Sequence, residues 1–263
     1  MIAASVSRAE PFVTYCVAIT VDRGLVFASD SRTNAGVDQV STFSKMHTLV
    51  ADSDRMITLL SAGNLATTQA VVRQLRRDME NNATTNLRSV KYLAEAAEYV
   101  GELSHEQRAR HRGKNDSSFN PEASFILGGQ IVGREPQIYL VYPEGNHIRA
   151  STETPYLQIG ETKYGKPILD RIINAELPLH DAARCALVSM DSTMRSNVTV
   201  GPPIEVLVYT RDNYGNISRL MLQEDDDYLR SLRRAWDASL KRAFEGLPGL
   251  PLPVSPRIRL VDG

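Results

Sequence analysis

The order in which strand-like and helix-like patterns follow one another constrains the fold of this chain more than any other feature. Two hairpin patterns precede the first helix pattern, with strands over 15–21 and 25–30 and then over 45–51 and 55–61. In the first pair, large apolar side chains alternate with smaller residues, and a turn over 22–24 reverses the chain. Antiparallel pairs before any helix argue against a parallel sheet, in which strands and helices alternate.

The remaining chain continues in blocks. The apolar period becomes helical at Leu65, and the sequence then predicts, in order, a helix from that residue, a helix over 88–112, strands over 123–132, 137–142 and 147–151, helices over 164–174 and 180–194, strands over 204–210 and 217–222, and a last helix begun by Asp225, Asp226 and Asp227. We expect the three aspartates to cap that helix rather than to bind a cation. The predicted class is α+β, with two antiparallel sheets stacked face to face and helices outside.

Composition and charge exclude several classes of protein. Hydrophobic residues make up 42% and charged residues 23%, as in a globular protein with a substantial core. The net charge of -1 gives no general attraction to nucleic acid or to an anionic membrane. No apolar stretch reaches the roughly 18 residues of a membrane span, and residues 1–7 lack the pattern of a signal peptide. We therefore expect a cytoplasmic protein without nucleic-acid or membrane partners.

Common cofactor and catalytic motifs are absent from the sequence. There is no P-loop, no GxGxxG and no GxSxG, and the five histidines have no metal-ligand spacing, so neither a cofactor nor a metal is expected. Cys16 and Cys185 lie in apolar segments without CxxC spacing, which favours filling of the core. Gly128 and Gly129, within a strand pattern, indicate a bulge or a close-packed site.

Thr14, at the start of the first predicted strand, is the candidate nucleophile. A threonine hydroxyl is a poor nucleophile unless a base lies beside it, and a threonine that is the first residue of a chain can use its own α-amine. Asp30 ends the second strand and Lys45 opens the third, both at distances that suit a shared site. Because residues 1–13 precede Thr14, this interpretation requires their removal.

Several segments carry a family resemblance. Residues 24–36, GLVFASDSRTNAG, closely resemble the segment after the catalytic threonine of proteasome β subunits, where an apolar strand ends in Asp-x-Arg. Residues 61–71, SAGNLATTQAV, resemble the glycine-led helix start of the same family. The segments TYCV at 14–17, STFSKMH at 41–47, QIGETKYGKP at 158–167 and SMDSTMRSN at 189–197 resemble a bacterial branch, the Anbu proteins. The resemblance implies the αββα sandwich of N-terminal-nucleophile hydrolases and self-assembly into a ring or an open helix.

The resemblance also implies roles for the candidate residues. The Thr14 hydroxyl would attack an amide and pass its proton to the freed Thr14 amine, directly or through water. The Lys45 ammonium would favour the neutral form of that amine, and Asp30 would hold Lys45 in place. The backbone N–H of Gly63 would bind the oxyanion.

A later segment is expected to lie beside the amine. Asp191 and Ser196 are the candidates, with Ser192 as the alternative serine, although the Asp-x-x-Ser spacing of proteasome subunits is absent. A second departure is Gly160-Glu161, where those subunits usually carry Gly-Ser-Gly. Substrate preferences of the family are therefore not carried over.

Three functions remain open at this point. The first is a threonine peptidase acting on peptides or unfolded chains, and the second is an amidase or acyltransferase acting on a small amide. The third is a non-catalytic, self-assembling scaffold, which applies if Thr14 stays internal. An apolar helix face with Leu229, Leu232 and Trp236 also indicates self-association.

We expect one hydrolase domain over 14–246, an extended tail over 247–263, and a leader or mis-assigned start over 1–13. Autolysis before Thr14 is one route to the free amine, but the β-branched Val13 would crowd the attack. Translation from the Val13 codon followed by methionine removal is the favoured route.

The first prediction is that the mature chain begins at Thr14. Intact-mass measurement of protein expressed from the native gene, with its own upstream region, should give the mass of residues 14–263. A mature chain that begins at Met1 or Ile2 would contradict both routes and favour the scaffold.

Overall fold

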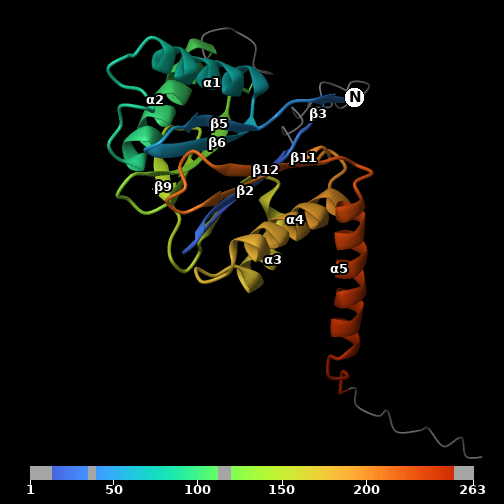
Figure 1. The fold of residues 1–263 in the computed structure, drawn as a ribbon. Coiled ribbons are helices and arrows are strands. Elements are labelled where there is room, and N and C mark those ends of the chain that lie inside the picture. The colour runs from blue at the N-terminus through green and yellow to red at the C-terminus, as the bar shows by residue number, and fades with distance from the viewer. Residues whose placement is uncertain (1–13, 35–39, 112–119, 252–263) are drawn as a thin grey trace, which may run out of the picture.

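Two five-stranded antiparallel sheets lie face to face between pairs of helices in the computed structural model, which describes residues 14–34, 40–111 and 120–251 (Figure 1). The first sheet has the order β10-β1-β2-β11-β12, with bounds Tyr156–Gly160, Tyr15–Val21, Gly24–Asp30, Ile204–Thr210 and Ile217–Leu222. The second has the order β5-β6-β7-β8-β9, with bounds Met46–Ala51, Arg55–Gly63, Ala123–Ile131, Gln137–Val141 and His147–Arg149. A short ribbon pairs β3 (Arg32–Asn34) with β4 (Val40–Thr42).

Helices cover the outer face of each sheet. The second sheet packs against α1 (Leu65–Glu80) and α2 (Leu93–His111), and the first against α3 (Thr162–Ile172) and α4 (Leu179–Ser196). A fifth helix, α5 (Asp227–Glu245), packs on α4 at its start and then extends away from the layers (Figure 1). The predicted αββα sandwich is confirmed. None of the helices in the described ranges is long and apolar enough to cross a membrane.

The central strands of each sheet are buried on both faces, which explains their apolar sequences. In β1, Tyr15, Val17 and Ile19 point toward α3 and α4, whereas Cys16 and Ala18 point between the sheets. This follows from the alternation of side chains along a strand. Cys16 and Cys185 are both free and buried, as predicted.

Two adjacent glycines in β7 allow close packing, Gly128 against Phe27 of the facing sheet and Gly129 against the neighbouring strand β6 of its own sheet. A Cβ atom on Gly128 would lie 2.6 Å from the ring of Phe27, and one on Gly129 would lie 2.1 Å from the carbonyl oxygen of Met56. The prediction of a close-packed site at these glycines is confirmed.

A buried glutamine joins the sheets at the end opposite Asp30. The Gln130 side chain in β7 donates to the carbonyl of Arg134 and to Asp212 Oδ1, both at 2.7 Å. Its oxygen accepts from the Tyr209 hydroxyl at 2.7 Å and from the Asp212 N–H at 2.8 Å. Gln130 is 0% exposed, so these four bonds satisfy an amide that would otherwise be costly to bury.

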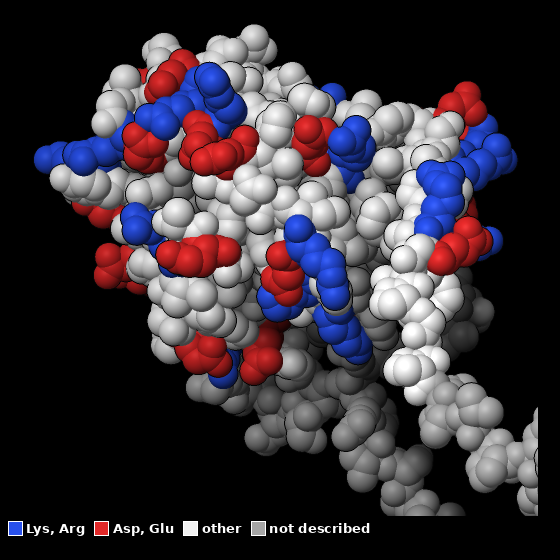
Figure 2. Space-filling view, turned by 90° about the horizontal axis from the view of Figure 1, so that it is seen from below, with Lys and Arg blue, Asp and Glu red and all other residues white. Residues whose placement is uncertain are grey.

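The last helix, α5, is capped by an aspartate at its start and is packed on the core only in its first part. Asp226 caps it by accepting from the N–H groups of Tyr228 and Leu229, which confirms the predicted role of the acidic triplet. Of the helix face expected to be partly exposed, Leu232 and Trp236 are half-buried, whereas Leu229 is 1% exposed and belongs to the core, so the expectation was wrong for Leu229 alone. Elsewhere, charges of both signs are interspersed over the face shown in Figure 2, in keeping with the near-zero net charge.

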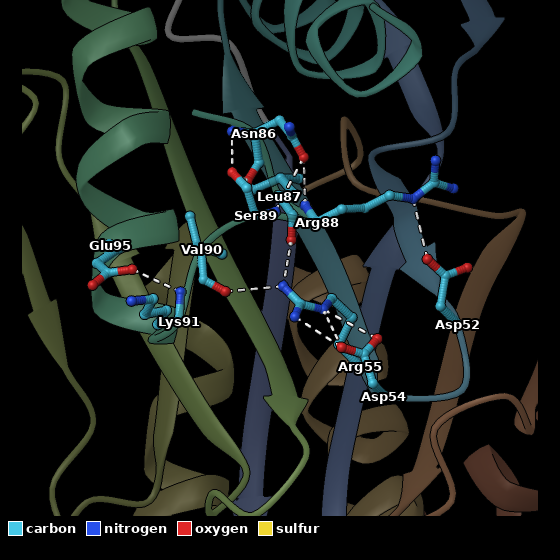
Figure 3. Close-up of polar contacts among 10 residues, drawn as sticks. All are labelled: Asp52, Asp54, Arg55, Asn86, Leu87, Arg88, Ser89, Val90, Lys91 and Glu95. Atoms are coloured by element: carbon cyan, nitrogen blue, oxygen red, sulfur yellow. Dashed lines mark hydrogen bonds and ion pairs between the residues drawn. The ribbon is translucent and has the colours of Figure 1, made fainter. Parts of the chain in front are cut away.

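Helix α2 begins at Leu93, five residues later than predicted, because the preceding segment is bound to the β5–β6 hairpin (Figure 3). Arg55 donates to the carbonyls of Leu87 and Val90 at 3.3 and 2.9 Å, so these oxygens do not accept helical bonds. The Glu95 carboxylate accepts from the N–H of Lys91 at 2.8 Å and caps the helix from within.

Three strands were not predicted. They are the short pair β3 and β4 and the five-residue β10, which covers the outer edge of β1 with Tyr15 opposite Gly160. Two predicted segments lie wholly or mostly outside the described residues: the leader over 1–13 and the extended tail over 247–263, of which only 247–251 are described.

The second prediction concerns Gln130. Gln130→Met should lower the free energy of unfolding by about 3 kcal/mol, because it leaves buried donors and acceptors without partners. Urea denaturation gives the value, and Gln69→Met, at an exposed position of α1, should change it by less than about 0.5 kcal/mol. Equal effects of the two changes would contradict a structural role for the buried amide.

Candidate active site

Thr14 and Asp30 meet where β1 begins and β2 ends. The β1–β2 hairpin pairs Cys16 with Ser29, so the residue before β1 lies beside the last residue of β2. The Thr14 hydroxyl donates to Asp30 Oδ1 at 2.6 Å, and the N–H of Tyr15 donates to the same oxygen at 3.1 Å. The hairpin register therefore places the predicted nucleophile on the predicted carboxylate.

Lys45 reaches the same carboxylate oxygen from the other sheet. It immediately precedes β5, and its Nζ lies 2.7 Å from Asp30 Oδ1 and 2.7 Å from the carbonyl oxygen of Arg32. Asp30 is 0% exposed and the Lys45 side chain is 11% exposed. Removing either charge would leave the other buried without its partner, so the pair fixes the ammonium close to the Thr14 hydroxyl.

The end of β6 closes a third side of the site. The Ser61 N–H donates to the Lys45 carbonyl at 2.9 Å, and the Cys16 thiol lies 3.8 Å from the Ser61 carbonyl oxygen. Gly63 follows two residues later, directly before Asn64, the residue that caps α1. A helix start of this kind favours negative charge, which suits the predicted oxyanion role of Gly63.

The structure gives a separate reason for glycine at position 63. Its φ is +104°, and a Cβ atom there would lie 2.4 Å from the carbonyl oxygen of Glu122. A side chain is therefore excluded by the neighbouring backbone of the chain before β7, independently of any substrate.

Hydrogen bonds fix the backbone of Thr14 and the side chain of the next residue, Tyr15. Glu161 N–H donates to the Thr14 carbonyl at 2.7 Å, and a Cβ atom on Gly160 would lie 1.9 Å from that carbonyl oxygen. The buried Tyr15 hydroxyl lies 2.5 Å from the Ser189 hydroxyl and accepts from Gln158 at 2.5 Å. These contacts explain the glycine of the Gly160-Glu161 pair and fix the position of β1 against α4.

The segment between α4 and β11 also reaches the site, which the sequence did not indicate. The Gly201 N–H lies 3.4 Å from Asp30 Oδ2, and Arg32 donates to the Val198 carbonyl at 2.7 Å. A Cβ atom on Gly201 would lie 2.4 Å from the Arg32 guanidinium carbon. This proximity comes from the β2–β11 pairing, in which Ile204 lies opposite Asp30, and no local motif announces it.

Asp191 and Ser196 lie elsewhere on α4. Asp191 is 2% exposed; its Oδ1 accepts from Arg233 of α5 at 2.5 Å, and its Oδ2 lies 3.7 Å from Arg195. Ser196 is the exposed last residue of the helix. Among the described hydrogen bonds, neither residue contacts Thr14, Asp30 or Lys45, and the same holds for Ser192. Their support of the amine stays a prediction.

The buried thiol beside the site is not a competing nucleophile. Burial raises the pKa of Cys16 far above its ordinary value, despite the opposing effect of Lys45. The thiolate, which is the reactive form, is therefore scarce. Across the ranges that the structure describes, no cluster of three or more His, Cys, Asp or Glu residues could hold a metal ion.

Comparison with known proteins extends these observations. The family described as "Proteasome subunit" matches residues 14–209. Anbu (ancestral beta-subunit) from Yersinia bercovieri is 44% identical with a TM-score of 0.84, over 92% of this chain and 100% of its own. The helical assembly of the Anbu complex from Pseudomonas aeruginosa is 45% identical with a TM-score of 0.86, over 90% and 98%. Anbu from Hyphomicrobium sp. strain MC1 is 41% identical with a TM-score of 0.82, over 91% and 100%. No curated protein matches the chain.

Proposed function

The chain belongs to the Anbu branch of the proteasome subunit family, and from this membership we propose that it is a threonine peptidase that hydrolyses peptides or unfolded chains. One observation carries the proposal: the Thr14 hydroxyl and the Lys45 ammonium converge on a single buried oxygen of Asp30. A purely structural charge pair does not require a hydroxyl on the same oxygen. Such an arrangement supports activation of a nucleophile beside a fixed positive charge.

The mechanism uses Thr14 as the first residue of the mature chain. An α-amine has a pKa of about 8 in a model peptide, and the neighbouring Lys45 ammonium lowers it, so that the amine is neutral and basic at neutral pH. The amine takes the hydroxyl proton as Oγ1 attacks the scissile carbonyl carbon. The negative charge then forms on the carbonyl oxygen, where the Gly63 N–H donates to it.

Collapse of the tetrahedral intermediate breaks the scissile C–N bond. The amine of Thr14 returns its proton to the departing nitrogen, which leaves an ester between Thr14 and the acyl half of the substrate. Water then attacks the ester, with the same amine as base, and restores the free hydroxyl. Each step uses the amine alternately as base and as acid, so the reaction requires removal of residues 1–13.

The third prediction tests the nucleophile and the charge beside it. In the mature chain, Thr14→Ala should abolish hydrolysis of an unfolded protein and covalent labelling by a peptide epoxyketone or β-lactone. It should destabilise the fold by only about 1 kcal/mol. Lys45→Met should lower the turnover number and move the acid limb of the pH–rate profile to higher pH, because the amine loses a neighbouring positive charge.

Matched variants separate the alternatives. Thr14→Ser keeps a hydroxyl and should retain labelling, and Lys163→Met, at an exposed lysine of α3, should leave the profile unchanged. Cleavage of small amides without cleavage of long chains would favour an amidase. Turnover of Thr14→Ala at the wild-type rate would exclude Thr14 as nucleophile.

We also propose that the chain assembles with copies of itself, as the relative from Pseudomonas aeruginosa does in its helical assembly. The far end of α5 and the residues just after it support this, because Leu240 and Phe244 in the helix and Leu247 beyond it are 49%, 75% and 62% exposed. Exposed charged side chains, those of Lys241, Arg242 and Glu245, lie in the same stretch of the helix and border these apolar residues. Apolar side chains at such exposure favour a contact between copies.

The fourth prediction is that Phe244→Glu weakens self-association, because it places a charge in the apolar contact. Analytical ultracentrifugation at micromolar concentration should show large species for the wild type and smaller species for the variant. Val132→Glu, at an exposed position at the end of β7, is the control. A wild-type protein that sediments only as a monomer would contradict assembly.

A further inference from the structure

A second buried carboxylate, Glu205, lies beside Asp30 and takes no part in the reaction proposed above. It belongs to β11, where Ile204 is opposite Asp30 and Glu205 is opposite Ser29. Glu205 is 5% exposed, so its charge needs partners in the protein. Its partners are Ser31, which follows Asp30, and Arg219, which also contacts the residue after Lys45.

One partner adjoins Asp30. The hydroxyl of Ser31, the residue after Asp30, donates to Glu205 Oε1 at 3.3 Å. Ser31 is 3% exposed, so this contact is shielded from water. Glu205 thereby holds the chain directly after Asp30 against β11.

The other partner, Arg219, contacts the residue after Lys45. Arg219 of β12 approaches Glu205 Oε2 at 3.2 Å, and the same guanidinium nitrogen donates to the carbonyl of Met46, the residue after Lys45, at 3.5 Å. Glu205 and Arg219 therefore connect the backbone after Asp30 to the backbone after Lys45. The connection crosses from the first sheet to the second.

The contact between Lys45 and Asp30 itself depends on the distance between the sheets. Lys45 precedes β5 in one sheet and Asp30 ends β2 in the other, so a small separation of the sheets would break their 2.7 Å contact. Gln130 ties the sheets at the opposite end, far from this pair. We propose that Glu205 and Arg219 are positioning residues, which hold the two sheets at the spacing that the Asp30–Lys45 contact requires. The inference rests on the proposed peptidase function.

Charge balance in this region leads to a specific test. Asp30 and Glu205 are negative, and Lys45 and Arg219 are positive, with Arg32 and His47 nearby. Burial, Arg76 and Arg219 lower the pKa of His47 to about 4, so it is neutral at neutral pH. Loss of Arg219 alone leaves Glu205 as an unpaired negative charge, which raises the pKa of the Thr14 amine. Loss of both the Glu205 and the Arg219 charge leaves no unpaired charge, but the connection between the two sheets stays broken.

The experiment compares Arg219→Met with the double variant Glu205→Gln/Arg219→Gln in the mature chain. Arg219→Met should lower kcat about tenfold with little change in KM, because it misplaces groups of the site and not the substrate. Its acid limb should move to higher pH. The double variant should move the acid limb less than Arg219→Met does, because no unpaired charge remains at position 205 and only the displacement of Lys45 acts on the amine, while kcat stays low.

A control variant and two contrary outcomes test the positioning role of Glu205 and Arg219. Arg211→Met removes an ion pair with Glu135 at the other end of the first sheet and should change neither kcat nor the profile. Unchanged kcat and profile in Arg219→Met, with only a lower melting temperature, would overturn the positioning role. Recovery of the full wild-type kcat by the double variant would show that charge alone matters.

A crystal structure of the double variant tests the inference separately from the proposed function. The contact between Lys45 Nζ and Asp30 Oδ1 should lengthen beyond hydrogen-bonding distance. An unchanged contact overturns the inference whether or not the wild type cleaves peptides. A wild type that neither turns over nor reacts with the epoxyketone contradicts the proposed function, and the crystallographic result still decides the inference.

Discussion

The buried carboxylate of Asp30 is the group on which the rest of the site depends. Its two oxygens accept from the Thr14 hydroxyl, the Tyr15 N–H, the Lys45 ammonium and the Gly201 N–H. An ionised carboxylate at 0% exposure is costly unless such donors surround it. Since these donors come from three separated segments, satisfying one charge fixes the ends of β1, β2 and β11 and the start of β5 together.

The layered fold makes this convergence possible. The two central strands β1 and β2 are buried on both faces, and each has a paired neighbour on its outer side, so their ends cannot slide without breaking a ladder. Close contact between Gly128 and Phe27, together with the Gln130 bonds, keeps the sheets at a short separation at one end. The polar residues at the other end then lie within hydrogen-bonding distance across the two sheets.

Sequence reasoning recovered the parts of the fold and site that depend on local patterns. The β1–β2 hairpin has a two-residue turn, so its register, and with it the meeting of Thr14 and Asp30, follows from nearby residues. The strand β10 was missed because its pairing with β1 joins residues 137 to 145 positions apart. Gly201 and the Glu205–Arg219 pair were missed for the same reason, since neither forms a motif within its own segment.

Asp191 illustrates how a family expectation and the surrounding chain can differ. The family resemblance of residues 189–197 places Asp191 beside the Thr14 amine. In the structure, the Asp191 carboxylate is paired with Arg233 and Arg195. Replacing it would leave two arginines at the α4–α5 contact without their buried partner. The residues directly after α4 continue to Val198 and Gly201, which contact Arg32 and Asp30. The helix α4 therefore both packs against α5 and leads into the segment that donates to the Asp30 carboxylate. A loss of activity on changing Asp191 could arise through this segment, so it would not by itself show that Asp191 contacts Thr14.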